Sequence, residues 1–334
     1  MMRLILILLL LLGMAPQAVA QWTPDHLGDG FMMHRVALPD DYSGKVRATV
    51  VRKLARDSRR AVVYVHGYND YFFQTEMANR MVDSCFNFYA VDLRKYGRSL
   101  LPGQVRFEVR DLAEYFPEID SVMTIAVRDG NTSILLMGHS TGGLITSYYM
   151  AKGRGDRFPV RGLILNSPFL DMNLSPFLED VAVPLVSFVS PVLRNIKVSE
   201  SDGNAYAQSL LRRYHGEWDY NTRWKLEYSP DVYSAWLGAI HKAHVYVQQG
   251  TDIRVPILLM YSARSVSGST WTPDFNDADA VLDVNDIARY GQRLGADVHH
   301  LRVHGGLHDL VLSRRPVREA LYKAIFRWIH SKIE

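Results

Sequence analysis

One short stretch, Gly138-His139-Ser140-Thr141-Gly142, has the residue types of a turn that presents a nucleophile. An apolar run over residues 133–140 leads into it, and a helix is predicted over residues 142–152. G-x-S-x-G between a buried strand and a helix is typical of a sharp turn that exposes a serine hydroxyl above the sheet. A plain Gly/Ser turn is the alternative, but both flanks favour the nucleophile. We therefore predict that Ser140 is a catalytic nucleophile.

A serine hydroxyl needs a general base, because its own pKa lies far above neutral. His308, in "RVHGGLHDLVLS", follows the predicted strand at residues 298–303 and precedes a predicted C-terminal helix, which makes it our candidate base. A zinc site is the rival interpretation of this histidine-rich region. However, His299 and His300 should point to opposite faces of the strand, and no helical His/Glu metal motif accompanies them. We predict no metal and no cofactor, and a structural role for His304.

The third member of such a site should follow the predicted strand at residues 256–262 and orient the imidazole. Asp279, which begins "DAVLDVNDI", is our preferred acid, and Asp277 and Asp283 are the alternatives. Calcium is a further interpretation of "DFNDAD", but the stretch lacks the glycine and the distal glutamate of a calcium loop.

Acyl transfer also requires hydrogen-bond donors for the developing oxyanion. The backbone N–H of Thr141, directly after the nucleophile, is one expected donor. The N–H of Tyr68, in "YVHGYND" after an earlier predicted strand, is the second. We interpret His66 in the same loop as structural.

Buried strands alternate along the chain with segments long enough for helices. The strand runs are continuously apolar, which is typical of parallel strands covered on both faces. This order predicts an α/β fold with a mostly parallel, doubly wound sheet. The predicted strands are 61–67, 86–92, 133–140, 162–168, 256–262 and 298–303, with a mixed run at 46–54 that suits an antiparallel edge. The predicted helices are 74–83, 109–128, 142–152, 284–294 and 316–333.

Residues 169–249 interrupt this alternation, with helical and aromatic sequence and no strong central strand. We interpret the segment as a helical cap insertion over the site, although an extra subdomain with its own packing also fits. Its aromatic side chains would line an apolar pocket or pack with one another: Trp218, Tyr220, Trp224, Tyr228, Tyr233 and Trp236.

With Ser140, Asp279 and His308 in this order, the sequence resembles the α/β-hydrolase superfamily. It is most similar to the monoacylglycerol lipase and lysophospholipase-like serine hydrolases, a group related to serine aminopeptidases. The resemblance rests on "VYVHGYND", "FYAVDLRKYGRS", "LLMGHSTGG", "LILNSPFLD", "DAVLDVNDI" and "GGLHDLVLS". It implies an α/β-hydrolase fold with Ser140, Asp279 and His308 as the triad, Tyr68 and Thr141 as oxyanion donors, and a cap within residues 169–249. It also implies that "VDLRKYGRS" is a structural loop at the pocket edge.

The first twenty residues have the pattern of a secretory signal peptide. Arg3 precedes an apolar run at residues 4–12, which is too short to span a bilayer comfortably, and Ala18-Val19-Ala20 forms a cleavage site. We therefore expect export to the periplasm or outside, with a hydrolase domain over residues 21–334. The only cysteine, Cys85, allows no internal disulfide, and we interpret it as a buried structural thiol.

The leading hypothesis is a serine esterase for small-molecule acyl esters, such as monoacylglycerols or lysophospholipids, with peripheral contact with lipid. A net charge of +3 over 334 residues, without a basic block, argues against nucleic acid as the partner. The alternatives are an aminopeptidase-like amide hydrolase, whose cap acids would hold a substrate amine, and a non-catalytic binding protein. The sequence does not determine the oligomeric state.

Overall fold

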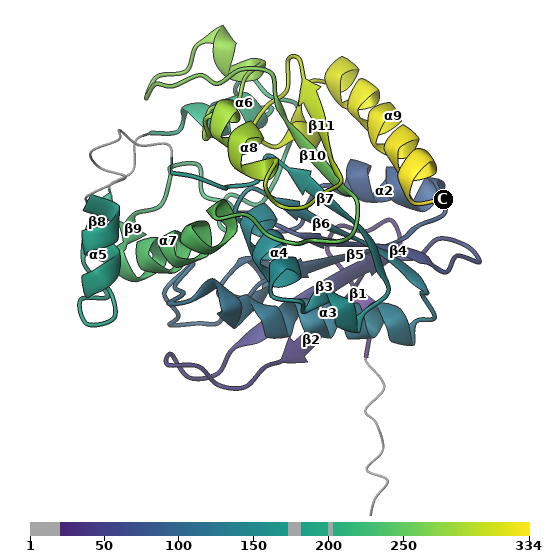
Figure 1. The fold of residues 1–334 in the computed structure, drawn as a ribbon, viewed down its shortest axis with the longest axis horizontal. Helices are drawn as coiled ribbons and strands as arrows, with labels where there is room; N and C mark the ends of the chain where they lie inside the picture. Colours follow the sequence, from purple (N-terminus) through teal and green to yellow (C-terminus); the bar gives the residue numbers. More distant parts are fainter. Residues whose placement is uncertain (1–20, 173–181, 200–202) are drawn as a thin grey trace, which may run out of the picture.

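A computed structural model describes residues 21–172, 182–199 and 203–334. Its centre is a nine-stranded sheet, with strands in the order β1-β2-β3-β5-β4-β6-β7-β10-β11 (Figure 1). The strands are β1 (Thr23–Pro24), β2 (Met32–Ala37), β3 (Arg47–Lys53), β4 (Arg60–Val65), β5 (Asn87–Asp92), β6 (Ser133–His139), β7 (Val160–Asn166), β10 (Ile257–Ser262) and β11 (Val298–Val303).

The sheet is parallel from β5 to β11 and antiparallel at its other edge, where β2 pairs with β3 and β3 with β5. The predicted α/β class and the mostly parallel sheet are therefore confirmed. Because the parallel strands run in one direction, the loops that follow them meet at one edge of the sheet. Ser140, Asp279 and His308 all lie in loops or turns after such strands.

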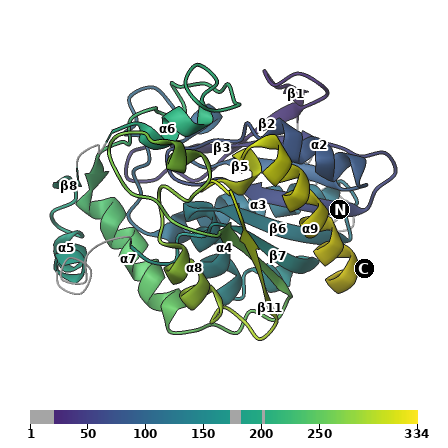
Figure 2. The same ribbon diagram turned by 90° about the horizontal axis from the view of Figure 1, so that it is seen from above.

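Helices cover both faces of the sheet (Figures 1 and 2). The helices of the described residues are α2 (Thr75–Asp83), α3 (Phe116–Arg128), α4 (Thr141–Ala151), α5 (Val183–Val189), α6 (Ala205–Leu210), α7 (Ser234–Gln248), α8 (Val284–Gly291) and α9 (Arg315–Lys332). Short 3-10 turns are η1 (Gly97–Ser99), η2 (Leu112–Tyr115), η3 (Gly155–Arg157), η5 (Pro273–Asn276) and η6 (Leu310–Leu312). Within the described ranges, no helix has the length and apolarity that crossing a bilayer requires.

Strand residues alternate between two buried cores. Val63 and Val65 belong to the core that includes residues of α3, α4 and α8, whereas Val62 and Tyr64 belong to the core that includes residues of α2 and α9. This alternation is the two-residue period of a strand, and burial on both faces explains the continuous apolar runs.

Two sequence-based predictions need correction. The helix predicted over 109–128 begins at Phe116, because the Asp111 and Glu114 side chains form a capping box that starts η2 instead. Cys85 is exposed rather than buried. It follows the end of α2 with a positive φ of 61°, and this left-handed turn between helix and strand leaves its side chain outside the core.

The "VDLRKYGRS" loop after β5 contains a buried ion-pair group. Arg98 lies 2.9 Å from the Asp92 carboxylate and 2.7 Å from Asp25, and all three side chains are buried. The guanidinium therefore joins the N-terminal segment to the end of β5, which is the structural role that the resemblance implied.

Between β7 and β10, the described residues add no strand to the central sheet. They form α5, α6, α7 and a two-stranded sheet of β8 (Lys197–Ser199) and β9 (Val232–Tyr233). The helix α7 packs against both α5 and α4, so one side of the segment rests directly on the hydrolase core. That the segment acts as a cap over bound substrate stays a prediction.

A buried histidine fixes α7 to the loop after β7. His244 Nε2 donates a hydrogen bond to the Phe169 carbonyl oxygen at 2.8 Å, and the two rings pack edge to face. Because burial disfavours the imidazolium, the pKa of His244 is lowered from 6.5 to about 4.

We predict that acid destabilises the protein through His244. Below pH 6.5 His244 binds a proton in the unfolded chain but stays neutral in the folded chain until the pH nears 4. The free energy of unfolding therefore decreases as the pH is lowered, by about 3 kcal/mol at pH 4. His244→Gln, which keeps a donor for Phe169, should show a shallower decline between pH 7 and pH 4.5 in urea unfolding. An equal decline in variant and wild type would contradict this assignment.

Candidate active site

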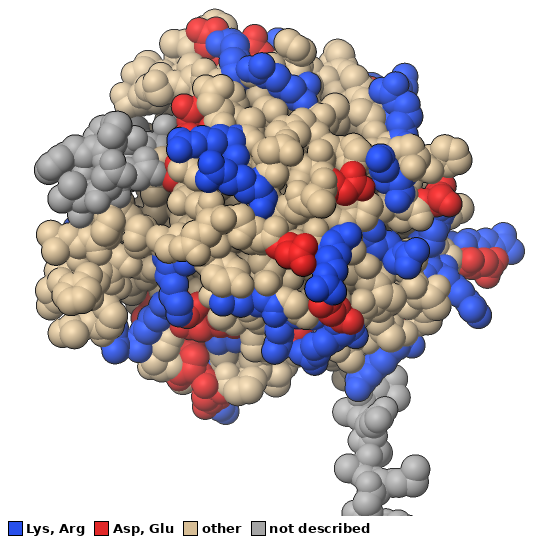
Figure 3. All heavy atoms as spheres, in the orientation of Figure 1, with Lys and Arg blue, Asp and Glu red and all other residues tan. Residues whose placement is uncertain are grey.

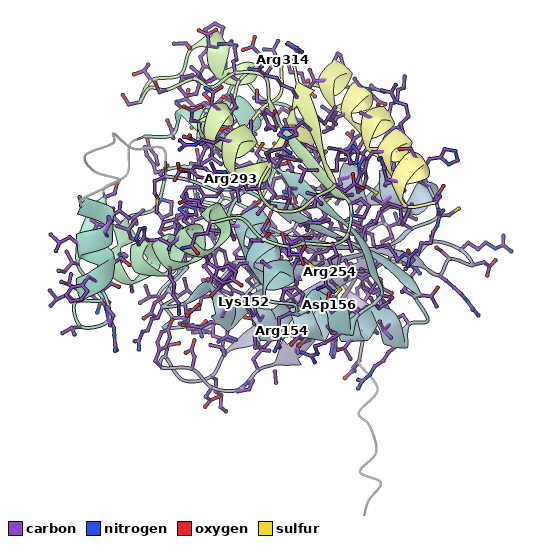
Figure 4. All side chains as sticks on the ribbon, in the orientation of Figure 1. Lys152, Arg154, Asp156, Arg254, Arg293 and Arg314 are labelled. Carbon is purple, nitrogen blue, oxygen red and sulfur yellow. The ribbon has the colours of Figure 1, made fainter. Side chains whose placement is uncertain are left out.

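Ser140 occupies a strained turn between β6 and α4. Its φ of 53° and ψ of −120° lie in a region that side chains rarely adopt. The turn places Ser140 at the N-terminal end of α4, whereas Lys152 lies beyond the opposite end of the helix (Figure 4). The positive end of the helix dipole therefore faces the serine, and Lys152 complements the negative end.

Glycines make this turn sterically possible. A Cβ atom on Gly142 would lie 2.3 Å from the Val65 carbonyl oxygen, and one on Gly138 would lie 2.4 Å from the carbonyl oxygen of Gly142. A Cβ atom on Gly67 would lie 2.9 Å from the Ser140 Cβ atom. The backbones of β6, α4 and the loop after β4 thus approach one another so closely that a residue with a Cβ atom would clash at these three glycine positions.

His308 lies against Ser140, although 168 residues separate them in the chain. Its Nε2 atom is 2.9 Å from Ser140 Oγ, and its Nδ1 atom is 2.9 Å from Asp279 Oδ2. All three side chains are buried, with exposed fractions of 8% or less. The structure thus brings together the three residues that the sequence singled out, in one hydrogen-bonded chain.

Asp279 is placed by a loop that leaves the sheet after β10 and returns. The Asp279 N–H donates to the Arg264 carbonyl, and the Val266 N–H donates to the Asp279 carbonyl, which re-forms a bridge of strand type. Its Oδ1 atom accepts the N–H groups of Val281 and Leu282, each at 2.8 Å. One oxygen is therefore held by the backbone, and the other faces the imidazole.

The two alternative acids have other partners. Asp277 pairs with Arg264 on the surface. Asp283 caps α8 by accepting the N–H of Asn285. Neither shares the position of Asp279.

The two expected oxyanion donors line the same cavity as Ser140. The residues Tyr68 and Thr141 both contribute to its wall, and neither backbone N–H donates to an acceptor in the described part of the chain. His66 has the structural role expected of it, since its Nε2 atom accepts the Leu93 N–H and its Nδ1 atom donates to the Gly67 carbonyl.

Comparison with known proteins identifies the family of this chain. Residues 56–266 match the family model described as "Serine aminopeptidase, S33". The chain belongs to the serine aminopeptidase S33 family.

Relatives of this S33 hydrolase include lipases and esterases. Phospholipase YtpA of Bacillus subtilis is 26% identical over 242 residues, which covers 67% of this chain and 80% of that protein. A monoglyceride lipase of Saccharomyces cerevisiae superimposes with a TM-score of 0.63 at 13% identity, covering 96% of this chain and 98% of the lipase. A carboxyl esterase of Bacillus coagulans gives 0.61 at 12% identity, covering 90% and 99%. The two structures share the α/β-hydrolase fold with this chain, and the family identifies a hydrolase.

A cavity of about 320 Å³ opens over Ser140 in this S33 hydrolase. Of the six aromatic residues that the sequence offered as pocket lining, Tyr220 and Trp236 line it. Trp218 and Trp224 pack elsewhere, with Trp218 donating to the Leu312 carbonyl. The loop after β10 supplies Phe275 and residues 280–282 to the wall, so the stretch before Asp279 also shapes the cavity.

At the wall of the cavity lies a buried polar cluster that the sequence analysis did not find. It contains Asp70, His139, Asp309 and Lys225, all with exposed fractions of 8% or less. The Lys225 ammonium lies 3.1 Å from Asp70 Oδ1, and the His139 and His308 rings are 4.9 Å apart. The cluster joins residues adjacent to the nucleophile and the base with Lys225 from the segment between β7 and β10.

Asp70, His139 and Asp309 have the donor types of a metal site. Their atoms are largely used by the chain itself, however. Asp309 accepts hydrogen bonds on both oxygens, from Asn166 and Gln74, and Lys225 neutralises Asp70. His139 donates from Nδ1 to the Asn166 carbonyl, and burial lowers its pKa, which favours the neutral ring. This arrangement fits an internal ion-pair cluster better than a metal centre.

We predict that Gly142→Ala destabilises the protein, although alanine favours helices over glycine by about 1 kcal/mol. The new methyl group meets a strand carbonyl that cannot move, so the net loss should be about 1–3 kcal/mol by calorimetry. Gly155→Ala, which meets only the flexible Met150 side chain, is the matched control. A Tm for Gly142→Ala at or above that of the control would refute the steric argument.

Breaking the Asp70–Lys225 pair should be costly. Lys225→Met leaves a buried carboxylate without its counter-ion, and we expect a loss of about 3–5 kcal/mol in urea unfolding. Adding Asp70→Asn should recover much of that loss, because the uncompensated charge is then removed. Arg212→Met, which breaks an exposed pair with Asp219, should cost under about 1 kcal/mol. A small effect of Lys225→Met would mean that the pair is solvated.

Proposed function

We propose that this chain is a serine hydrolase of carboxylic esters that works through an acyl-enzyme on Ser140. The observation that carries the proposal is the hydrogen-bonded chain from Ser140 Oγ through the His308 imidazole to Asp279, with 2.9 Å at each link. A non-catalytic binding protein would have no need for this series of hydrogen bonds beside an open cavity.

The geometry supports a two-step reaction. His308 Nε2 takes the Ser140 proton as Oγ attacks the ester carbonyl, and the resulting oxyanion accepts the N–H groups of Tyr68 and Thr141. His308 then gives the proton to the leaving alcohol oxygen as the ester C–O bond breaks. Water, deprotonated by His308, attacks the acyl-enzyme and releases the carboxylic acid and free Ser140.

Asp279 orients the ring throughout this cycle. Because Oδ2 faces Nδ1, it fixes the tautomer in which Nε2 is free to accept the serine proton. The two backbone donors on Oδ1 prevent the carboxylate from rotating away.

The charges in the cavity favour an ester over an N-terminal amine. A peptidase of the aminopeptidase type needs an acid that is free to hold the substrate ammonium. Among the described residues of the cavity wall, Glu227 is the one acid, and it is paired with Arg213. Two acids that the sequence offered for this role, Glu217 and Asp219, pair with Arg318 and Arg212. The others, Glu179, Asp180, Glu200 and Asp202, lie outside the described residues.

Within this proposal, monoacylglycerols and lysophospholipids are the favoured substrates, and contact with lipid is peripheral. The similarity to a phospholipase and to a monoglyceride lipase supports that choice. We also propose that the chain is exported after cleavage at Ala20, a view supported by the charged, apolar and small-residue regions of residues 1–20, which lie outside the described structure.

The proposal predicts that p-nitrophenyl esters, from acetate to palmitate, are hydrolysed faster than aminoacyl anilides. Ser140→Ala should lower kcat by about 10⁴-fold or more and abolish labelling by a fluorophosphonate. Asp279→Asn should lower kcat by about 10³–10⁴-fold through the wrong imidazole tautomer. Asp277→Asn and Asp283→Asn are the controls and should retain wild-type rates. Wild-type protein that neither reacts with the fluorophosphonate nor cleaves any ester would end the proposal.

A further inference from the structure

A second cavity of about 240 Å³ lies beside the one that contains Ser140. The two cavities share Tyr68 and Trp236, whose rings are 4.6 Å apart and form the boundary between them. The second cavity is built from the loop at residues 105–109, the connection between α5 and β8, and the start of α7. Figure 1 shows α5, β8 and β9 together at one side of the molecule, next to α7, and Figure 2 shows α5 and β8 at the same side.

Aromatic rings form much of the wall of this second cavity. The Tyr68 ring lies 5.0 Å from Phe107 as well as 4.6 Å from Trp236. The Tyr68 hydroxyl donates to the Asp231 carbonyl, which fixes the ring between the two cavities. The residue whose N–H is expected to serve the oxyanion thus also presents its side chain to the second cavity.

The charges on this wall are unbalanced. Its two acids are already paired, Glu108 with Lys95 at 3.2 Å and Asp231 with Lys197 at 3.1 Å. Arg106 and Arg194 also line the cavity, and neither has a carboxylate partner within the described ranges. Among the described residues, the Arg194 side chain makes one hydrogen bond, from Nε to the Pro191 carbonyl, and its two terminal nitrogens have no partner there.

This pattern differs from that of the first cavity. Figure 3 shows basic and acidic side chains interspersed over the face in view. In the Ser140 cavity, Lys225 and Glu227 each have a partner of opposite charge. Two guanidinium groups without carboxylate partners, beside aromatic walls, are suited to a planar or tetrahedral anion on an organic group.

We propose that the second cavity binds an anionic group, a phosphate or a carboxylate, carried on the alcohol part of the ester. This inference rests on the proposed function and specifies its substrate class. The acyl chain occupies the Ser140 cavity, while the alcohol part passes the edge of the Tyr68–Trp236 pair and brings its anion to Arg106 and Arg194.

The test compares esters with one short acyl chain, soluble as monomers, and three alcohols. These are glycerol, glycerol 3-phosphate and glycerate. We expect kcat/KM to be about tenfold higher for at least one anionic ester than for the glycerol ester, since hydrogen bonds to charged groups have this magnitude. The gain should appear mainly in KM, because the contact is made before and during the reaction alike. A gain for phosphate only or carboxylate only identifies the anion, and either result supports the proposal.

Variants connect the preference with the cavity. Arg106→Gln with Arg194→Gln should bring the ratio of anionic to neutral kcat/KM close to one. Arg223→Gln, an exposed arginine that lines neither cavity, is the matched control and should keep the wild-type ratio. Should the double variant fail to fold, each single variant should still lower the ratio.

The outcomes distinguish the anion-site proposal from the esterase proposal on which it rests. A neutral ester cleaved as fast as the anionic esters, or a ratio that survives loss of both arginines, would overturn the anion site while leaving the esterase proposal intact. Absence of hydrolysis of all three esters, together with an unlabelled Ser140, would instead reject the esterase proposal.

Discussion

The close approach of backbone segments around Ser140 is the constraint on which the rest of the site depends. Ser140 lies in a turn with positive φ, where the backbone of β6 and α4 approaches the end of β4 and the loop that follows it. Every other group of the site is delivered to that point by loops at the same edge of the parallel sheet. The sheet therefore determines where the chemistry takes place, and the glycines allow the backbone segments around Ser140 to pack closely.

Burial gives this arrangement its rigidity and also its electrostatic character. His308 and Asp279 lie among buried side chains, so their hydrogen bonds are shielded from water and strengthened. Behind them, the Asp70–Lys225 pair ties the segment between β7 and β10 to the loop that carries Tyr68. The segment that shapes the substrate cavity and the loop that holds an oxyanion donor are thus joined by a buried ion pair, together with hydrogen bonds such as the one from the Tyr68 hydroxyl to the Asp231 carbonyl.

The sequence was informative wherever the signal was local. The positions of Ser140 and His308 followed from short patterns next to strands, and burial on both faces of the sheet produced apolar runs that predicted the central strands. Contacts between residues far apart in the chain could not be predicted from the sequence. Asp70 and Lys225 are 155 residues apart, and nothing around either position indicates the pairing. Cys85 was misplaced because its apolar neighbours concealed a left-handed turn, and the second cavity arises only from packing between loops.

The excursion between β10 and Asp279 has an architectural consequence. Because the chain re-joins itself at Ser265 and Asp279, the intervening residues form an appendage that is closed at its base. Its length is uncoupled from the position of the carboxylate, so the excursion can grow or shrink without disturbing the imidazole. A scaffold of this kind can remodel the wall of its substrate cavity while its reactive groups stay in register.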